Sequence, residues 1–406
     1  MKRVTFIHAA DLHLDSPMLG LADLPKPIFK RLQESSFEAL RKITDAAILH
    51  HVDFVIISGD LFDAEDRSIK AQTKFRKEME RLDEKGIPVF IIHGNHDFAD
   101  GNWVQVDMPD NVYVFPTYVE TVPFTSKDGI KVHLYGFSYP KRHVYEEMIS
   151  HYKKVSGADF HIGILHGNAD GGSEHEKYAP FSVKDLLEKD FDYWALGHIH
   201  KRGMLHDAPA VIYPGNIQGR HRKETGQKGC YLVELTHQGA NLQFIETSTV
   251  MWEQTIEDAA QADTFQDIYA MCKEIIEQYR LDQKGIILSL VLENINLPAQ
   301  DLKPIWNGEL LEILQEEEKD EENFVWVTEI SLVEKVNWTH EQLANESEFY
   351  SELFAISRNA EELNESIEAL YHHPSARRYL GELKPDEIDI LANEAESLLV
   401  KLLYSK

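Results

Sequence analysis

The strongest constraint on the fold is a series of short apolar runs that end in glycine, aspartate or other polar residues. Such runs are typical of buried strands. They lie at Val4–His8, Phe54–Ser58, Val89–His93, Val132–Phe137, His161–Leu165 and Tyr193–Leu196. Helical patterns lie at 28–51, 69–85 and 142–154, and hairpin-like runs follow at 210–213, 230–235 and 242–246. This alternation predicts an α/β fold in which two packed sheets are flanked by helices.

Five polar motifs follow apolar runs and together offer carboxylate, amide and imidazole ligands. They are Asp11-Leu12-His13, Gly59-Asp60-Leu61-Phe62-Asp63, Gly94-Asn95-His96-Asp97, His166-Gly167 and Gly197-His198-Ile199-His200. Functional residues of open α/β sheets gather at the carboxyl ends of the strands. Divalent metals held by such ligands activate water and bind phosphate oxygens. The set therefore predicts a metal-dependent phosphoesterase.

Spacing within the motifs supports metal binding. Residues two apart in an extended chain point to the same side, so Asp11 with His13, and His198 with His200, could each grip one ion. Gly59 permits a sharp turn before Asp60, whose two carboxylate oxygens could bridge two ions. Asp-x-His alone is common by chance and Gly94-Asn95-His96-Asp97 is far more specific, but the ordered set of five is hard to produce by chance.

The third motif adds a candidate catalytic residue. The amide oxygen of Asn95 is a neutral hard ligand, which leaves His96 free to face the substrate. Either Asp63 or Asp97 could orient the His96 ring.

The chain of 406 residues is too long for one average domain. Near residue 255 the pattern changes to a helix at 264–279 and strands at 286–292 and 324–333, with 308–314 left unassigned. The acidic run at 316–322 is interpreted as a solvated loop. We expect a catalytic domain over 1–250, a small α+β capping domain over 255–340 and a helical tail over 341–406. Apolar stripes at 349–370 and 388–402 could form a core, or dock partner helices or a coiled coil.

Charge and cysteine content constrain partners and location. The formal net charge is −28, from 41 basic and 69 acidic residues, whereas proteins that bind DNA alone usually have a basic face. The densest basic cluster contains Arg220, Arg222 and Lys223, which could contact phosphates or form a solvated loop. The two cysteines show no metal spacing and no disulfide framework. With no membrane span or signal peptide predicted, we expect a cytoplasmic protein.

The order of the five motifs resembles that of the calcineurin-like metallophosphoesterases over residues 1–250. Tyr213-Pro214-Gly215-Asn216, the second domain and the tail make the chain similar to the SbcD-type DNA repair exonuclease branch. Two positions differ from the nuclease pattern, since Asn216 stands where serine is common and Asp15 where glycine is common. These differences leave the ligand set intact but bear on substrate preference.

The resemblance implies specific roles. One metal would be bound by Asp11, His13, Asp60 and His200, and the other by Asp60, Asn95, His166 and His198. His96 would be the catalytic histidine, and Asp63 the residue that orients it. Two Mn²⁺ ions are expected, with Fe²⁺, Zn²⁺ and Mg²⁺ as alternatives. A hydroxide bridging the metals would attack in line with the leaving oxygen.

The function implied is that of a DNA exonuclease in DNA repair or processing, working with an SMC-like ABC ATPase. Self-association into a homodimer would be another way to assemble a DNA-binding surface. One alternative is a phosphodiesterase or phosphatase acting on nucleotides or other small phosphoesters, which the acidic charge favours. Another is a non-catalytic scaffold of the same fold, although a scaffold would not need Asn95 and His96 together.

Overall fold

The computed structural model describes residues 2–18, 21, 24–63, 68–100, 104, 106–169, 178–334, 343, 347–357 and isolated positions between 367 and 399. The chain divides into two compact units, Met1–Val333 and Glu334–Lys406.

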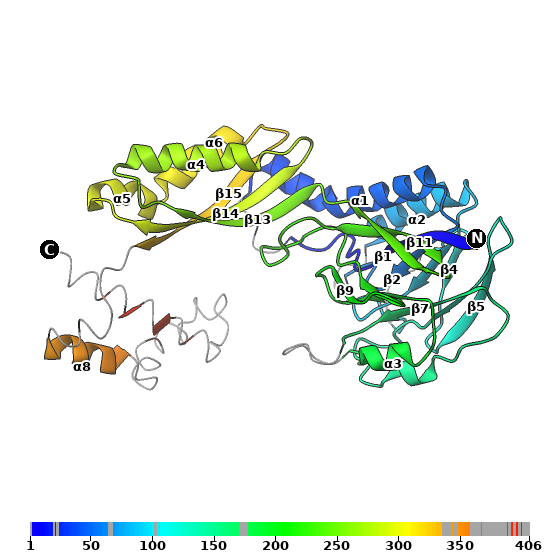
Figure 1. The fold of residues 1–406 in the computed structure, drawn as a ribbon. Helices are drawn as coiled ribbons and strands as arrows, with labels where there is room; N and C mark the ends of the chain where they lie inside the picture. The colour runs from blue at the N-terminus through cyan, green and yellow to red at the C-terminus, as the bar shows by residue number, and fades with distance from the viewer. Residues whose placement is uncertain are drawn as a thin grey trace. The chain divides into compact units, whose positions relative to one another are not determined.

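The first six-stranded sheet has the order β12-β11-β1-β2-β3-β4 (Figure 1). Its neighbours β1 to β4 are parallel, and β11 and β12 run antiparallel at one edge. The strands are β1 (Arg3–Ala9), β2 (Phe54–Ser58), β3 (Val89–Ile92), β4 (Val112–Val114), β11 (Gly229–Thr236) and β12 (Gly239–Glu246). Because β1, β2 and β3 are parallel neighbours, the loops that follow them start at the same edge of the sheet.

The second six-stranded sheet has the order β5-β6-β7-β8-β10-β9. Its central neighbours β6, β7, β8 and β10 are parallel. The strands are β5 (Glu120–Thr125), β6 (Lys131–Gly136), β7 (Phe160–His166), β8 (Tyr193–Gly197), β9 (Gly203–His206) and β10 (Ala210–Tyr213). The two sheets pack face to face through a buried core in which Phe6 contacts both Phe54 and Tyr193. The predicted α/β two-sheet sandwich is confirmed.

Helices cover the outer face of the first sheet. They are α1 (Lys26–Leu49) and α2 (Ile69–Asp83), which pack on that face through a second apolar core. The Ser68 side chain caps α2 by accepting from the Ala71 N–H, which satisfies a free donor of the first turn. The second sheet is covered by irregular chain, the short 3-10 helix η1 (Met148–His151) and α3 (Val183–Leu187).

The helix predicted at 142–154 is wrong except for η1. The Ala179 N–H donates to the Val144 carbonyl at 2.6 Å, and Val144 is buried against the second sheet. This tertiary pairing takes the carbonyl that a helix would need, and the β-branched Val144 has a weak helix propensity.

A three-stranded sheet follows, with the order β13-β14-β15. Its elements are β13 (Val250–Asp258), α4 (Phe265–Tyr279), β14 (Gly285–Ile295), α5 (Ala299–Trp306), α6 (Glu309–Glu318) and β15 (Val325–Glu334). Alternate residues of β14 point to opposite faces: Ile286 and Leu288 pack in the core with the helices, and Ile287 packs with Ile28 and Leu32 of α1.

The acidic run is not entirely a solvated loop. Its first three residues belong to α6, and Glu318 is 2% exposed. The Glu318 carboxylate pairs with Arg280 at 2.7 Å and accepts from the Val325 N–H at 2.8 Å. A buried carboxylate is stable only with such partners, and nothing in the hydrophobic periodicity pointed to them.

In the second unit, α8 (Glu348–Ser357) lies within the predicted helical tail. Leu343 and Phe354 form a small apolar cluster with Tyr350 and Leu353. Most of the predicted stripes at 349–370 and 388–402 lie outside the described residues. In the described part of the chain, no helix combines the length and apolar character needed to span a membrane.

Candidate metal centre

The predicted ligands meet at the carboxyl ends of β1, β2, β3, β7 and β8. Several hold a left-handed backbone that non-glycine residues rarely adopt. The φ angles are 51° at Asp11, 41° at His13, 50° at Asp60 and 100° at His198. Strained backbone of this kind persists where the surrounding structure fixes it, and it is concentrated at functional sites.

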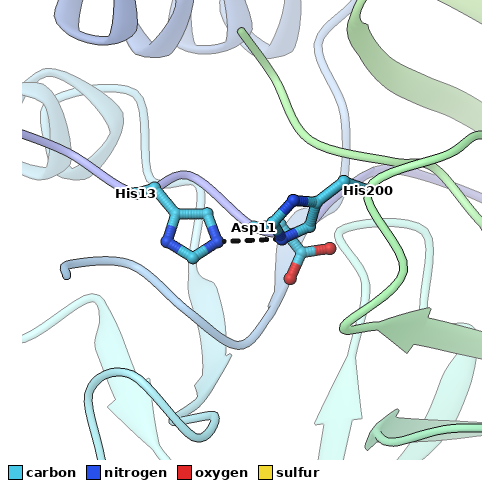
Figure 2. Close-up of side chains that lie close together, drawn as sticks. All are labelled: Asp11, His13 and His200. Carbon is cyan, nitrogen blue, oxygen red and sulfur yellow. Dashed lines mark hydrogen bonds between the residues drawn. The ribbon is translucent and has the colours of Figure 1, made fainter. Parts of the chain in front are cut away.

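The first group of donors comprises Asp11, His13 and His200, whose ligand atoms all lie close together. Figure 2 shows the two imidazole rings facing one another beside the Asp11 carboxylate. The Nε2 atoms of His13 and His200 are 3.1 Å apart, and Asp60 Oδ2 lies 3.7 Å from His13 Nε2.

The second group converges on Asn95. Its Oδ1 lies 3.0 Å from His166 Nε2 and 3.1 Å from His198 Nδ1. His166 Nε2 is also 3.4 Å from Asp60 Oδ2, the same oxygen that faces His13. Asp60 therefore lies between the two groups.

Protonation of the histidines fits a cation site. Burial lowers the pKa of His13 to about 4 and that of His198 to about 3, so both rings are neutral at pH 7 and offer a lone pair. Burial also acts to lower the pKa of His166, but Asp60 and Asp11 outweigh it and raise that pKa to about 9. The carboxylates thus attract positive charge at the point where the neutral donors converge. This mixture of oxygen and imidazole donors suits divalent transition metals.

Glycines make this close convergence possible. A Cβ on Gly59 would lie 2.3 Å from His166 Nδ1, and the φ of Gly59 is +95°. A Cβ on Gly94 would lie 2.3 Å from Asp60 Oδ1. Neither position can take a side chain without moving a candidate ligand.

His96 forms a third group of close ligand atoms with His13 and Asp63, and Asp63 orients its ring. Its ring Nδ1 is 2.7 Å from Asp63 Oδ1, and its backbone N–H donates to Asp60 Oδ1 at 2.9 Å. Burial acts to lower the pKa of His96, but Asp63 and Asp60 together raise it. Asp97, the other candidate, instead accepts from the backbone N–H groups of Leu61 and Gly94.

The three basic residues predicted to bind substrate occupy different places. The Arg220 guanidinium donates to Asp63 Oδ2 at 3.1 Å, so it lies at the site. Arg222 extends away and approaches Glu329 of β15 at 3.7 Å. Arg222 and Lys223 line an open cavity of about 760 Å³ between their loop and strands β13 to β15.

Sequence reasoning missed Glu224. Its Oε1 lies 2.6 Å from His200 Nδ1, and its Oε2 accepts from the Arg220 N–H at 2.8 Å and from Asn216 Nδ2 at 2.9 Å. A proton on His200 Nδ1 would leave Nε2 as the donor atom that faces His13. Asn216, one of the two departures from the nuclease pattern, thus supports the carboxylate that orients a candidate ligand. Only the position of Glu224, soon after Asn216, could have pointed to it.

We expect Glu224→Ala to weaken Mn²⁺ binding by about 10–100-fold, the usual cost of losing a group that orients a metal ligand. Isothermal titration of the full-length protein with Mn²⁺ measures this. Glu80→Ala is a matched control, because Glu80 forms an exposed ion pair with Arg76 on α2. Equal Mn²⁺ affinity in Glu224→Ala and wild type would contradict the orienting role.

With this fold and site, the chain belongs to the calcineurin-like phosphoesterases, whose family pattern matches residues 4–202. It is 40% identical over 409 residues to YhaO of Bacillus subtilis, an uncharacterized metallophosphoesterase, with 98% of each chain covered. The family resemblance inferred from the five motifs is confirmed.

More distant relatives are repair proteins or nucleases by name. The chain is 25% identical to the DNA double-strand break repair protein Mre11 of Thermoplasma acidophilum, over 63% of this chain and 68% of that protein. It is 23% identical to a component of the SbcCD nuclease of Staphylococcus saprophyticus, over 75% of this chain and 83% of that protein.

Proposed function

We propose that this protein is a two-metal nuclease that hydrolyses phosphodiester bonds of DNA exonucleolytically, in DNA repair or processing. The observation that carries the proposal is the pair of donor groups joined by Asp60, with His96 beside them. Asp60 Oδ2 lies 3.7 Å from one group's His13 and 3.4 Å from the other group's His166.

The residues divide into metal ligands and groups that act on the substrate. One ion would be held by Asp11, His13, Asp60 and His200, and the other by Asp60, Asn95, His166 and His198. When bound, such ions polarise a phosphoryl oxygen and lower the pKa of water. We propose Mn²⁺ because the site mixes oxygen and imidazole donors, with Fe²⁺, Zn²⁺ and Mg²⁺ as the alternatives that the same donors allow.

His96 would contact the scissile phosphate or protonate the leaving oxygen. Its ring is held by Asp63 through Nδ1, which leaves Nε2 for the substrate. Arg220 bonds the other oxygen of Asp63, so the carboxylate is fixed from both sides. Arg220, Arg222 and Lys223 would bind phosphates along the loop that leads from the site to the cavity against β13–β15.

DNA is favoured over a small ester by the named relatives. The net charge of −28 favours the runner-up, a phosphodiesterase or phosphatase for nucleotides and other small phosphoesters. The third possibility, a non-catalytic scaffold, is disfavoured because it would need none of the donors that meet at Asp60.

So acidic a chain needs assembly to bind a long duplex tightly, because several cations must neutralise phosphates together. We propose an SMC-like ABC ATPase as partner, docked on the tail after about residue 345, with a homodimer as the other way to assemble. Comparing partner capture by full-length and truncated protein tests the docking. If the truncated form captured the partner fully, the docking proposal would be wrong and the tail would have a structural role only.

The decisive experiment for the function is a Mn²⁺ titration with end-labelled duplex and single-stranded DNA, beside a generic phosphodiester. Stepwise shortening of labelled DNA supports the exonuclease. Hydrolysis of the generic ester with no effect on DNA, even with the ATPase present, would favour the runner-up.

A further inference from the structure

A series of neighbouring aromatic rings leads from a candidate metal ligand to the protein surface. Tyr178 lies 5.1 Å from His198, measured between ring centroids, with the two ring planes tilted by 54°. His143 stacks on Tyr178 at 5.4 Å with 20° between the ring planes, and Tyr145 stacks against His143 at 5.8 Å and 13°. Tyr145 is 62% exposed. The series therefore has one end at the metal centre and the other in solvent.

The backbone holds these rings in place. The Ala179 N–H donates to the Val144 carbonyl, so the segments that carry Tyr178 and Tyr145 are hydrogen-bonded. The Asn168 N–H donates to the Tyr178 carbonyl at 2.9 Å, which ties the same segment to the end of β7. His198 itself lies 3.1 Å from Asn95 Oδ1. The backbone that carries the outermost ring is thus tied to the segment that follows β7, beside the donor groups.

Positive charge precedes the exposed ring. Lys141 and Arg142 are both exposed, and among the residues that the structure describes neither has an ion-pair or hydrogen-bond partner. On the other side of Tyr145, the Glu146 carboxylate is engaged by His151 at 2.9 Å. In so acidic a chain, two exposed cations only three and four residues before an exposed ring suit a ligand with both an aromatic face and phosphates.

We propose that Tyr145 is a stacking platform for an unpaired nucleotide of the substrate strand, with Lys141 and Arg142 binding the adjacent phosphates. The inference rests on the proposed function and adds that the site takes a strand with unstacked bases at this edge. Every base has a π-face, so stacking on an exposed tyrosine tolerates any sequence. A duplex end, whose bases are already stacked and paired, would gain less from the same ring.

Binding of a short phosphorothioate oligothymidylate and of a blunt duplex to the full-length, Mn²⁺-loaded protein tests this, by fluorescence anisotropy. We expect Tyr145→Ala to weaken single-strand binding by about tenfold or more, the usual effect of losing one base–aromatic stack. The blunt duplex should change less. Tyr145→Phe keeps the ring and should bind as wild type.

The matched control is Tyr118→Ala, because Tyr118 is also 62% exposed and takes no part in the stacked series. Equal single-strand binding by Tyr145→Ala and Tyr118→Ala would overturn the proposal, as would failure of the wild type to bind the oligonucleotide. The result is separable from the proposed function. If DNA is never cleaved but Tyr145→Ala still loses single-strand binding selectively, the platform stands and the nuclease assignment fails.

Discussion

Asp60→Ala should lose bound metal and hydrolytic activity together, and should be the most damaging single substitution at the site. The Asp60 carboxylate is 1% exposed and is the only described group that faces both His13 and His166 through one oxygen. Its removal takes a ligand from each proposed ion. Metal catalysis contributes several kcal/mol to such reactions, so we expect hydrolysis of a phosphodiester to fall by about 10³-fold or more.

Metal content by plasma emission spectroscopy and hydrolysis of a generic ester, on the same samples, measure both effects. Asp128→Ala is the matched control, since Asp128 is an exposed turn residue far from the site in sequence. Circular dichroism in chelator shows whether the variant folds. A folded Asp60→Ala protein with the wild-type metal content would contradict the bridging role.

The sequence predicted which residues would meet because strand ends obey simple geometry. Parallel strands such as β1, β2 and β3 bring their carboxyl ends to one edge, so Asp11, Asp60 and Asn95 had to lie near each other once the strands were recognised. Glycine is required before Asp60 and before Asn95, because a Cβ at either position would clash with a candidate ligand.

Long-range side-chain contacts could not be predicted in the same way. Glu224 reaches His200 because the loop after β10 folds back over the site, and no period or motif encodes that distance. The motifs alone left both Asp63 and Asp97 as candidates to orient His96, because Asp97 adjoins His96 in sequence while Asp63 reaches it only through the fold. The series of rings that ends at Tyr145 depends on the hydrogen bond from the Ala179 N–H to the Val144 carbonyl. The same hydrogen bond is the reason that no helix spans residues 142–154, where the sequence had predicted one.

Structure and sequence together separate two kinds of residue at this site. Groups such as His166 and Asn95 are 0% and 5% exposed and contact other donors. The His96 side chain is 29% exposed and is held from behind by Asp63. Variants of the two kinds should therefore fail in different ways, one by losing metal and the other by losing chemistry.

His96→Ala should keep its metals and lose the reaction. The His96 ring takes no part in the close contacts that join the two donor groups through Asp60, and instead contacts Asp63 at 2.7 Å. A histidine that donates a proton or stabilises charge in the transition state typically contributes about 10²–10⁴-fold to the rate, so we expect a loss of that size in kcat for a generic phosphodiester.

Mn²⁺ affinity of His96→Ala, measured by titration calorimetry, should stay near the wild-type value, in contrast to that of Asp60→Ala. His151→Ala, at an exposed ion pair with Glu146, is the matched histidine control and should leave both quantities unchanged. If His96→Ala lost its metals as fully as Asp60→Ala, His96 would be a ligand and the division between binding and chemistry would be wrong.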